Sequence, residues 1–150
     1  MASQYITFMI IFILGLSMVL LTNNMFSTLS DQFRENLAEI EMSQILDLIQ
    51  SQIMQTLLFS SDYNQTIDQQ LELPILLGQK FQYNIEIYNT TDNQVTLHGY
   101  SSDGKINQLT TFSVGAKYII ETSESSFQSI KALLTLHIER DANKVVITIL

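Results

Sequence analysis

Tyr5–Leu21 reads YITFMIIFILGLSMVLL, and this uncharged stretch decides how the rest of the chain can fold. Its seventeen residues would give about 26 Å of helix, close to the hydrocarbon thickness of about 30 Å. Met25 and Phe26, beyond a polar step at residues 22–24, allow a modest extension. Because backbone polar groups in lipid must bond internally, we expect a membrane-spanning helix.

Two other interpretations of this stretch are weighed against a retained anchor. A cleaved secretory signal needs a basic segment before the apolar run and small residues at the cleavage site. Met1–Gln4 contains no Lys or Arg, and residues 22–25 read TNNM. A buried core helix would need cover on all sides from a small chain. We therefore expect a transmembrane anchor over residues 1–24 with the N-terminus inside the cell.

Charge divides the 150-residue chain into three parts. Residues 1–30 carry no charged side chain, residues 31–72 hold eight acids and one base, and residues 73–150 hold seven acids and six bases. The formal net charge of -8 excludes the basic footprint of a protein that binds nucleic acid. An acidic middle is typical of a solvated helix face, or else of a surface for a cationic partner.

The residue types present offer few candidates for catalytic or metal-binding groups. Without Cys, a disulfide-stapled domain, a thiolate metal site and a Cys nucleophile are excluded. His98 and His137 lie on strand-like patterns without ligand spacing, so we expect surface or hydrogen-bonded histidines rather than metal ligands or catalytic groups. Glycine motifs for phosphates and nucleophile elbows are missing too. We expect no cofactor, no metal and no enzymatic activity.

Two N-x-[ST] sequons start at Asn64 and Asn89, in segments expected to be connectors. A chain with this content of Asn, Ser and Thr would contain about two such sequons by chance. They are candidate glycosylation sites if the domain is outside the cell.

The helical pattern continues beyond the membrane, because neither Gly nor Pro occurs between Gly15 and Pro74. Residues 25–58 predict an amphipathic helix with two successive apolar stripes. The proximal stripe consists of Phe26, Leu29, Phe33, Leu37 and Ile40. The distal stripe consists of Met42, Leu46, Ile49, Ile53 and Leu57.

The two stripes face different directions, because the step from Ile40 to Met42 turns the face by about 200°. We expect the distal stripe to dock on the chain's own C-terminal domain. The proximal stripe would then meet a like subunit or another membrane protein, unless a kink near Glu41 brings both stripes to one core. A continuous helix over residues 4–58 would be about 80 Å long, which suits a filament subunit or a stalk.

From Leu71 the apolar period changes to two, which predicts half-buried strands. After a connector at 59–70, strands are expected over residues 71–77, 81–87, 95–99, 106–114, 118–122, 130–138 and 145–149. This spacing predicts a small antiparallel β-sandwich over residues 71–150. The last strand should be central or paired rather than free, since bare apolar edges invite aggregation. The expected fold class is α+β, a long N-terminal membrane-spanning helix followed by the sandwich.

In architecture the chain resembles archaeal pilin-like surface proteins, most of all the accessory or stator subunits of the archaellum (archaeal flagellum). The resemblance rests on an N-terminal stub without basic residues, the apolar helix from Tyr5, its amphipathic continuation to about Leu58, and the Cys-free, strand-rich remainder. Processed pilins carry Lys or Arg before the apolar run, which Met1–Gln4 lacks, so unprocessed accessory subunits fit better.

The resemblance implies a single-pass protein of the cell membrane with an extracellular C-terminal domain. Such subunits anchor or stiffen a filament, and their partners are like subunits, other filament or envelope proteins, and the surface-layer protein. The expected function is therefore structural, with no role for nucleic acid. The alternative is a single-span sensory or solute-binding ectodomain, which predicts a concave pocket with converging polar groups.

Overall fold

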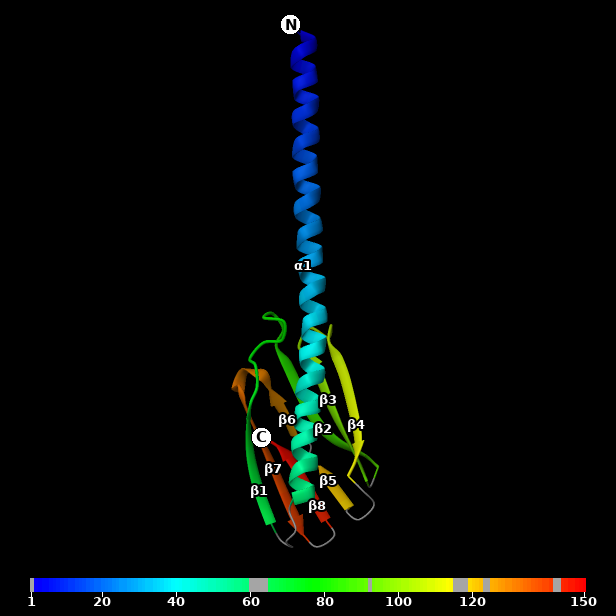
Figure 1. The fold of residues 1–150 in the computed structure, drawn as a ribbon, viewed down its shortest axis with the longest axis vertical. Coiled ribbons are helices and arrows are strands. Elements are labelled where there is room, and N and C mark those ends of the chain that lie inside the picture. The colour runs from blue at the N-terminus through cyan, green and yellow to red at the C-terminus, as the bar shows by residue number, and fades with distance from the viewer. Residues whose placement is uncertain (1, 60–64, 92, 115–118, 123–124, 142–143) are drawn as a thin grey trace. The chain divides into compact units, whose positions relative to one another are not determined.

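The computed structural model describes residues 2–59, 65–91, 93–114, 119–122, 125–141 and 144–150 (Figure 1). They form two compact units, Met1–Arg34 and Glu35–Leu150. Helix α1 (Ala2–Phe59) begins in the first unit and ends in the second. Among the described residues it is followed by eight strands and one short 3-10 helix. The chain is therefore α+β, as the sequence predicts.

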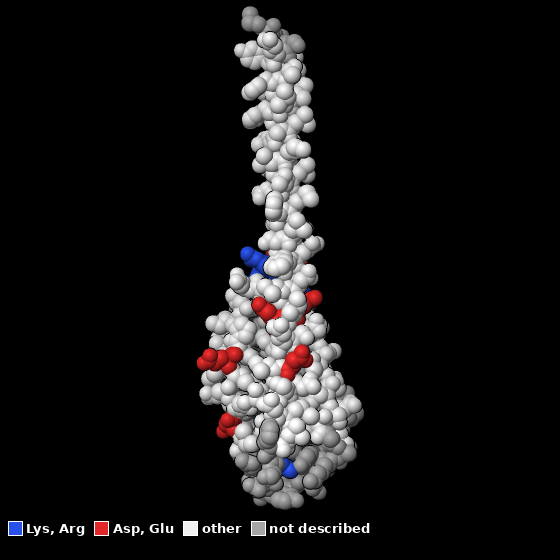
Figure 2. Space-filling model, viewed as in Figure 1, with Lys and Arg blue, Asp and Glu red and all other residues white. Residues whose placement is uncertain are grey.

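In the first unit α1 exposes its apolar side chains. Between Tyr5 and Leu21 the large hydrophobic residues are 53% to 74% exposed, and this length of helix is white in Figure 2 because it carries no charge. The most apolar 18-residue stretch of this helix has a mean hydropathy of 2.4, which makes the helix a candidate membrane span by length and composition. The interpretation of Tyr5–Leu21 as a buried core helix is wrong, because the second unit builds its core without it.

The second unit contains two four-stranded sheets. The first sheet has the order β1-β7-β8-β5, with bounds Gln65–Glu72, Leu133–Asp141, Lys144–Ile149 and Ile119–Thr122. The second has the order β4-β3-β2-β6, with bounds Asn107–Ser113, Gln94–Ser101, Tyr83–Thr91 and Ser125–Gln128. As expected, the C-terminal strand β8 is paired on both sides, by β7 and β5.

One hydrophobic core joins both sheets to α1, which lies along them in Figure 1. Strands β2, β7 and β8 contribute alternate residues, because side chains of a strand point to opposite faces. All members of the distal stripe are buried, with exposures of 8% or less. The docking of this stripe on the C-terminal domain is therefore confirmed.

Contacts on both flanks fix α1 between the two sheets. Met42 lies against Gly99 of β3, and Gln69 of β1 donates a hydrogen bond from Nε2 to Oε1 of Gln52, at 2.6 Å. The helix thus closes a core that two sheets of four short strands would leave open. At roughly 1.5–3 kcal/mol for each fully buried aliphatic side chain, the distal stripe is a major source of stability for this unit.

Four details of the strand pattern differ from the expectation. Residues 65–70, expected in a connector, belong to β1, which pairs with β7 and ends at Glu72, so the strand expected over residues 71–77 is wrong beyond Glu72. Strand β5 runs parallel to β8, so the first sheet is not wholly antiparallel. Strand β6 falls where a turn was expected.

The fourth difference concerns residues 129–131, which form the 3-10 helix η1 (Ser129–Lys131) instead of the start of a strand. Ala132 follows with φ 56°, in the left-handed region. This turn interrupts the alternation, and Ile130, which the alternation places inside, is 65% exposed.

Candidate interface on helix α1

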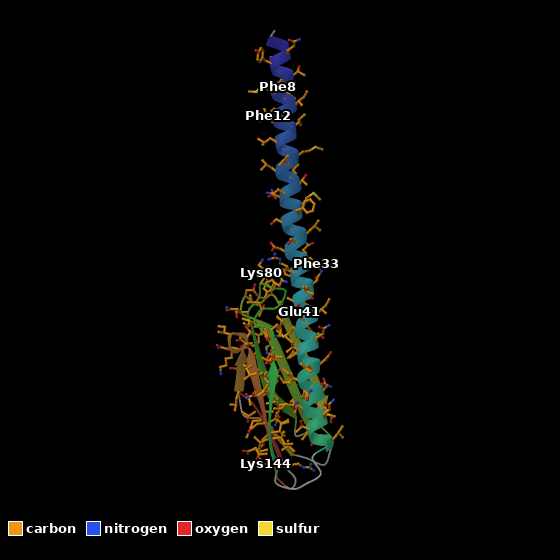
Figure 3. All side chains as sticks on the ribbon, turned by 60° about the vertical axis from the view of Figure 1, so that its left-hand side comes forward. Phe8, Phe12, Phe33, Glu41, Lys80 and Lys144 are labelled. Atoms are coloured by element: carbon orange, nitrogen blue, oxygen red, sulfur yellow. The ribbon has the colours of Figure 1, made fainter. Side chains whose placement is uncertain are left out.

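The proximal stripe is the candidate functional surface, and its first three members lie in the first unit. Phe26, Leu29 and Phe33 are 69%, 58% and 68% exposed, and Figure 3 marks Phe33 on the helix. Polar residues occupy other positions of the same turns: the Thr28 hydroxyl donates to the Asn24 carbonyl at 3.0 Å. The apolar side chains are therefore confined to one side of this stretch.

Leu37 and Ile40, the other two members, lie in the second unit. Leu37 is half-buried, and Ile40 is 56% exposed although its neighbours Ala38 and Met42 are fully buried. The helix passes Glu41 without a break. A kink near Glu41 that turns Ile40 into the same core is thus not present.

Glu41 lies at the change of face and fixes the rotation of the helix. Its Oε2 accepts a hydrogen bond from the backbone N–H of Gly78, at 2.7 Å. Gly78 and Gln79 have φ values of 53° and 61°, and the Lys80 N–H donates to the Leu77 carbonyl. Two successive positive φ values with this bond are typical of a type I′ turn. Figure 3 shows Glu41 on the helix and Lys80 in the turn.

Tyr83 buttresses the same turn. Its hydroxyl donates to the Pro74 carbonyl at 2.7 Å, and burial, with the negative charge of Glu41 as a second cause, raises the pKa of Tyr83 far above its usual value. The phenol therefore remains a protonated donor. A carboxylate and a neutral phenol together hold residues 74–80 against the helix.

An ion pair holds the start of the helix in the second unit. Lys105 Nζ pairs with Glu35 Oε1. Lys105 follows a turn in which Asp103 accepts from the Ser101 hydroxyl at 2.6 Å. That hydrogen bond is the main cause that lowers the pKa of Asp103. The first helical turn of this unit is thus tied to the β3–β4 connection.

A cluster of titratable groups lies on the outer face of the first sheet. His137 Nδ1 is hydrogen-bonded to Asp68, and its Nε2 to Glu139 at 3.0 Å. The two carboxylates, Asp68 first, raise the pKa of His137. Because Asp68 and Glu139 bond opposite ring nitrogens of His137, the two carboxylates do not converge on one point. In the described part of the chain, no group of three His, Cys, Asp or Glu residues is placed to hold a metal ion.

The second histidine lies on the outer face of the other sheet. His98 Nε2 contacts Asn107 Oδ1 at 3.0 Å, and its Nδ1 lies 3.7 Å from Glu86. The Tyr100 hydroxyl donates to the same carboxylate at 2.8 Å, which raises the pKa of Tyr100. Each of these groups is engaged by its neighbours, so the arrangement is that of a hydrogen-bonded surface.

The two sequons have different outcomes. Asn64 lies outside the described residues. Asn89 is exposed, but it belongs to β2, opposite Val95, and not to a turn. The prediction that both sequons lie in connectors is therefore wrong for Asn89.

A shallow depression of about 250 Å³ lies beside the start of β2. It is lined by Gln82, Tyr83, Asn84, Ser102, Gln128, Ser129 and Ile130. Polar and apolar atoms share its wall about equally, and Ser129 Oγ accepts a hydrogen bond from the Tyr83 N–H at 3.2 Å.

Sequence reasoning identified both stripes but missed the groups that orient them. Glu41 and Gly78 are 37 residues apart, Glu35 and Lys105 are 70 apart, and Asp68 and His137 are 69 apart. No local pattern connects such residues, and Asp68 lies in a segment that was expected to be a connector. Comparisons of the chain with family models, with curated proteins and with solved structures find no match.

Proposed function

We propose that the protein is a membrane-anchored structural subunit of the cell envelope, pilin-like or archaellum-accessory in kind. It assembles through the proximal stripe of α1 and presents its β domain to filament or surface-layer partners. One observation carries the proposal: on one helix, the distal stripe is buried by the chain's own sheets while Phe26, Leu29, Phe33 and Ile40 remain exposed.

The energetics favour a partner for this stripe. Burying a Leu, Ile or Phe side chain that is otherwise exposed gains roughly 1.5–3 kcal/mol. Four such side chains within 15 residues exceed what scattered surface hydrophobics supply, and contiguous apolar patches mark interaction sites. Charge does not oppose contact within the first unit, because Asp31 lies on the side of the helix away from Phe26, Leu29 and Phe33.

In this proposal the stretch Tyr5–Leu21 crosses the membrane once, and Phe26 to Phe33 lie at or just beyond its outer surface. The two sheets close as a β-sandwich outside the cell, with the distal stripe covering one side of the core. The resemblance in architecture to archaellum accessory subunits supports this arrangement. It also gives the second unit its role, the contact with a filament or the surface layer.

The test compares exposed and buried positions on the same helix. Full-length protein is extracted from membranes with mild detergent, and its assemblies are sized by sedimentation and viewed by negative-stain microscopy. We expect Phe33→Asp and Ile40→Asp to reduce assemblies to single chains while the thermal unfolding of the β domain, followed by circular dichroism, is unchanged.

The matched control is Leu46→Asp, which places the same charge in the core and should unfold the domain. The proposal is overturned if Phe33→Asp and Ile40→Asp leave the size of the assemblies unchanged. It is also overturned if Ile40→Asp unfolds the domain as Leu46→Asp does, because Ile40 would then belong to the domain's own core.

The alternative function, a solute-sensing ectodomain, would need a binding pocket, and the depression beside β2 is a candidate for it. Its volume of about 250 Å³ is below the about 300–1,000 Å³ of ordinary ligand pockets. We therefore favour the structural role.

A further inference from the structure

The aromatic residues of the first unit follow a seven-residue repeat. All five aromatic side chains of residues 1–34, and the single Gly, fall on positions a and d of one heptad register. Position a holds Tyr5, Phe12, Val19, Phe26 and Phe33, and position d holds Phe8, Gly15, Thr22 and Leu29. We call these nine residues the heptad seam.

The repeat is more regular than an apolar helix requires. In a lipid-facing span any position accepts Phe, so each aromatic has about a two in seven chance of falling on a or d. Five of five then occur about once in 500 trials, or about once in 75 after allowing for the choice among seven registers. The seam also continues past the polar step at residues 22–24, where lipid no longer accounts for Phe26, Leu29 and Phe33.

We propose that a second copy of this chain occupies the heptad seam, as a parallel, in-register pair of α1 helices. This inference rests on the proposed function, because membrane insertion is what makes the two helices parallel. Parallel helices at equal depth bring identical positions together, so a meets a and d meets d. A seam that carries no charge along its whole length is then complementary to itself.

The charge and the exposed area of the heptad seam both fit contact with a second copy of this chain. Each chain carries a formal charge of -8, yet the seam itself is uncharged, and Asp31 and Arg34 fall on positions f and b. The large seam residues are 58% to 73% exposed. They offer roughly 700–800 Å² per chain, close to the ~800 Å² per partner of a standard interface.

Gly15 provides the point of closest approach. A Cβ on Gly15 would meet nothing within 4 Å, and a small residue on an apolar helix lets a second backbone approach. Thr22 adds no unsatisfied polar group, because its hydroxyl donates to the Met18 carbonyl at 2.8 Å. A strict seven-residue repeat drifts by about 20° per heptad on a straight helix, so we expect a left-handed crossing of about 20°.

The absence of Cys allows a direct test in the full chain. Single Cys variants at Phe26, Leu29 and Phe33 lie on the seam, and Ser27→Cys and Asp31→Cys are controls on positions b and f. The variants are reconstituted in phosphatidylcholine vesicles and oxidised briefly, and disulfide-linked dimers are measured by non-reducing electrophoresis. We expect at least about threefold more dimer at the seam positions than at the controls, following the a/d geometry.

A second pair of substitutions probes the membrane part of the seam. Gly15→Leu should abolish the excess of dimer at Phe26→Cys, whereas Ser17→Leu, about 200° away around the helix, should preserve it. Equal cross-linking at seam and control positions, no cross-linking, or an unchanged yield in Gly15→Leu would each overturn the paired helix. If these results occur while Phe33→Asp still disperses the native assemblies, the proposed function stands and the partner is a different protein.

Discussion

A Cβ atom placed on Gly99 of β3 would lie 2.3 Å from Sδ of Met42 on α1, so the Met42 side chain occupies the space that a side chain at position 99 would need. The absence of a side chain at Gly99 thus leaves space in the core of the second unit for Met42, the first member of the distal stripe.

The first prediction concerns this contact. Gly99→Ala should lower the free energy of unfolding of the β domain by about 1–3 kcal/mol, because an added methyl group overpacks the core. The measurement is urea unfolding of the detergent-solubilised chain, followed by circular dichroism. Gly15→Ala is the matched control, since a Cβ there meets nothing within 4 Å.

A double-mutant cycle isolates the pair. Met42→Ala alone should cost about 2–5 kcal/mol through the cavity that it leaves. In the double variant the methyl group added by Gly99→Ala enters that cavity, so the double loss should be smaller than the sum of the single losses. Additivity within about 0.5 kcal/mol would contradict the contact.

The second prediction separates the two stripes with identical substitutions. Ile49 is fully buried and Ile40 is 56% exposed. Ile49→Ala should destabilise the domain by about 2–5 kcal/mol, and Ile40→Ala by no more than about 0.5 kcal/mol, as for ordinary surface positions. Thermal or urea unfolding measures both. Equal losses would mean that Ile40 is part of the core.

The third prediction concerns the contact between Glu41 and the turn. Glu41→Ala removes the acceptor of the Gly78 N–H and should cost about 1.5–3 kcal/mol, the range for hydrogen bonds to a charged group. Amide hydrogen exchange at Gly78 should accelerate accordingly. Glu39→Ala, two residues away and exposed, is the control and should leave exchange at Gly78 unchanged. Protection of Gly78 that survives Glu41→Ala would refute the role of the carboxylate.

The major elements were predictable from sequence because their periods are long and regular. The uncharged run of 17 residues from Tyr5 to Leu21, two stripes at helical spacing and the alternation in β2, β3 and β8 each constrain one element on its own. The step of about 200° around the helix from Ile40 to Met42 separated the two stripes, and this separation led to the prediction that the distal stripe is buried. These are local signals.

The errors fall where a local signal is weak or is overridden by tertiary contacts. Gln65–Glu72 contains only two large apolar residues, Ile67 and Leu71, and it becomes a strand through eight register partners on β7. Ile130 continues the alternation of β7 in sequence, but the left-handed Ala132 turns it outward. Strand β6 is four residues long and is identified only by its pairing with β2. The sequence showed the proximal stripe, but it did not show the contacts of Glu35 with Lys105 and of Glu41 with Gly78 that hold the helix.

The fourth prediction follows from the pair of carboxylates around His137. They raise its pKa above the usual 6.5 in the folded chain, so the charged imidazolium is favoured by folding. A group whose pKa is higher in the folded state stabilises it fully below the unfolded pKa. That contribution is lost as the pH rises through the folded value. Stability should therefore decline above about pH 6.5, and His137→Gln should flatten this dependence.

The size of the effect is limited because the groups are at the surface. Asp68 and Glu139 have side-chain exposures of 64% and 57%, and solvent screening limits such pairs to about 1 kcal/mol or less. A sharper readout is the titration of His137 by NMR in wild type and in Asp68→Asn. Because Asp68 is the largest cause of the shift, its loss should move the pKa of His137 down while the remaining carboxylate keeps it above the unfolded value. A titration midpoint that does not respond to Asp68→Asn would show that the bond between β1 and β7 does not form in solution.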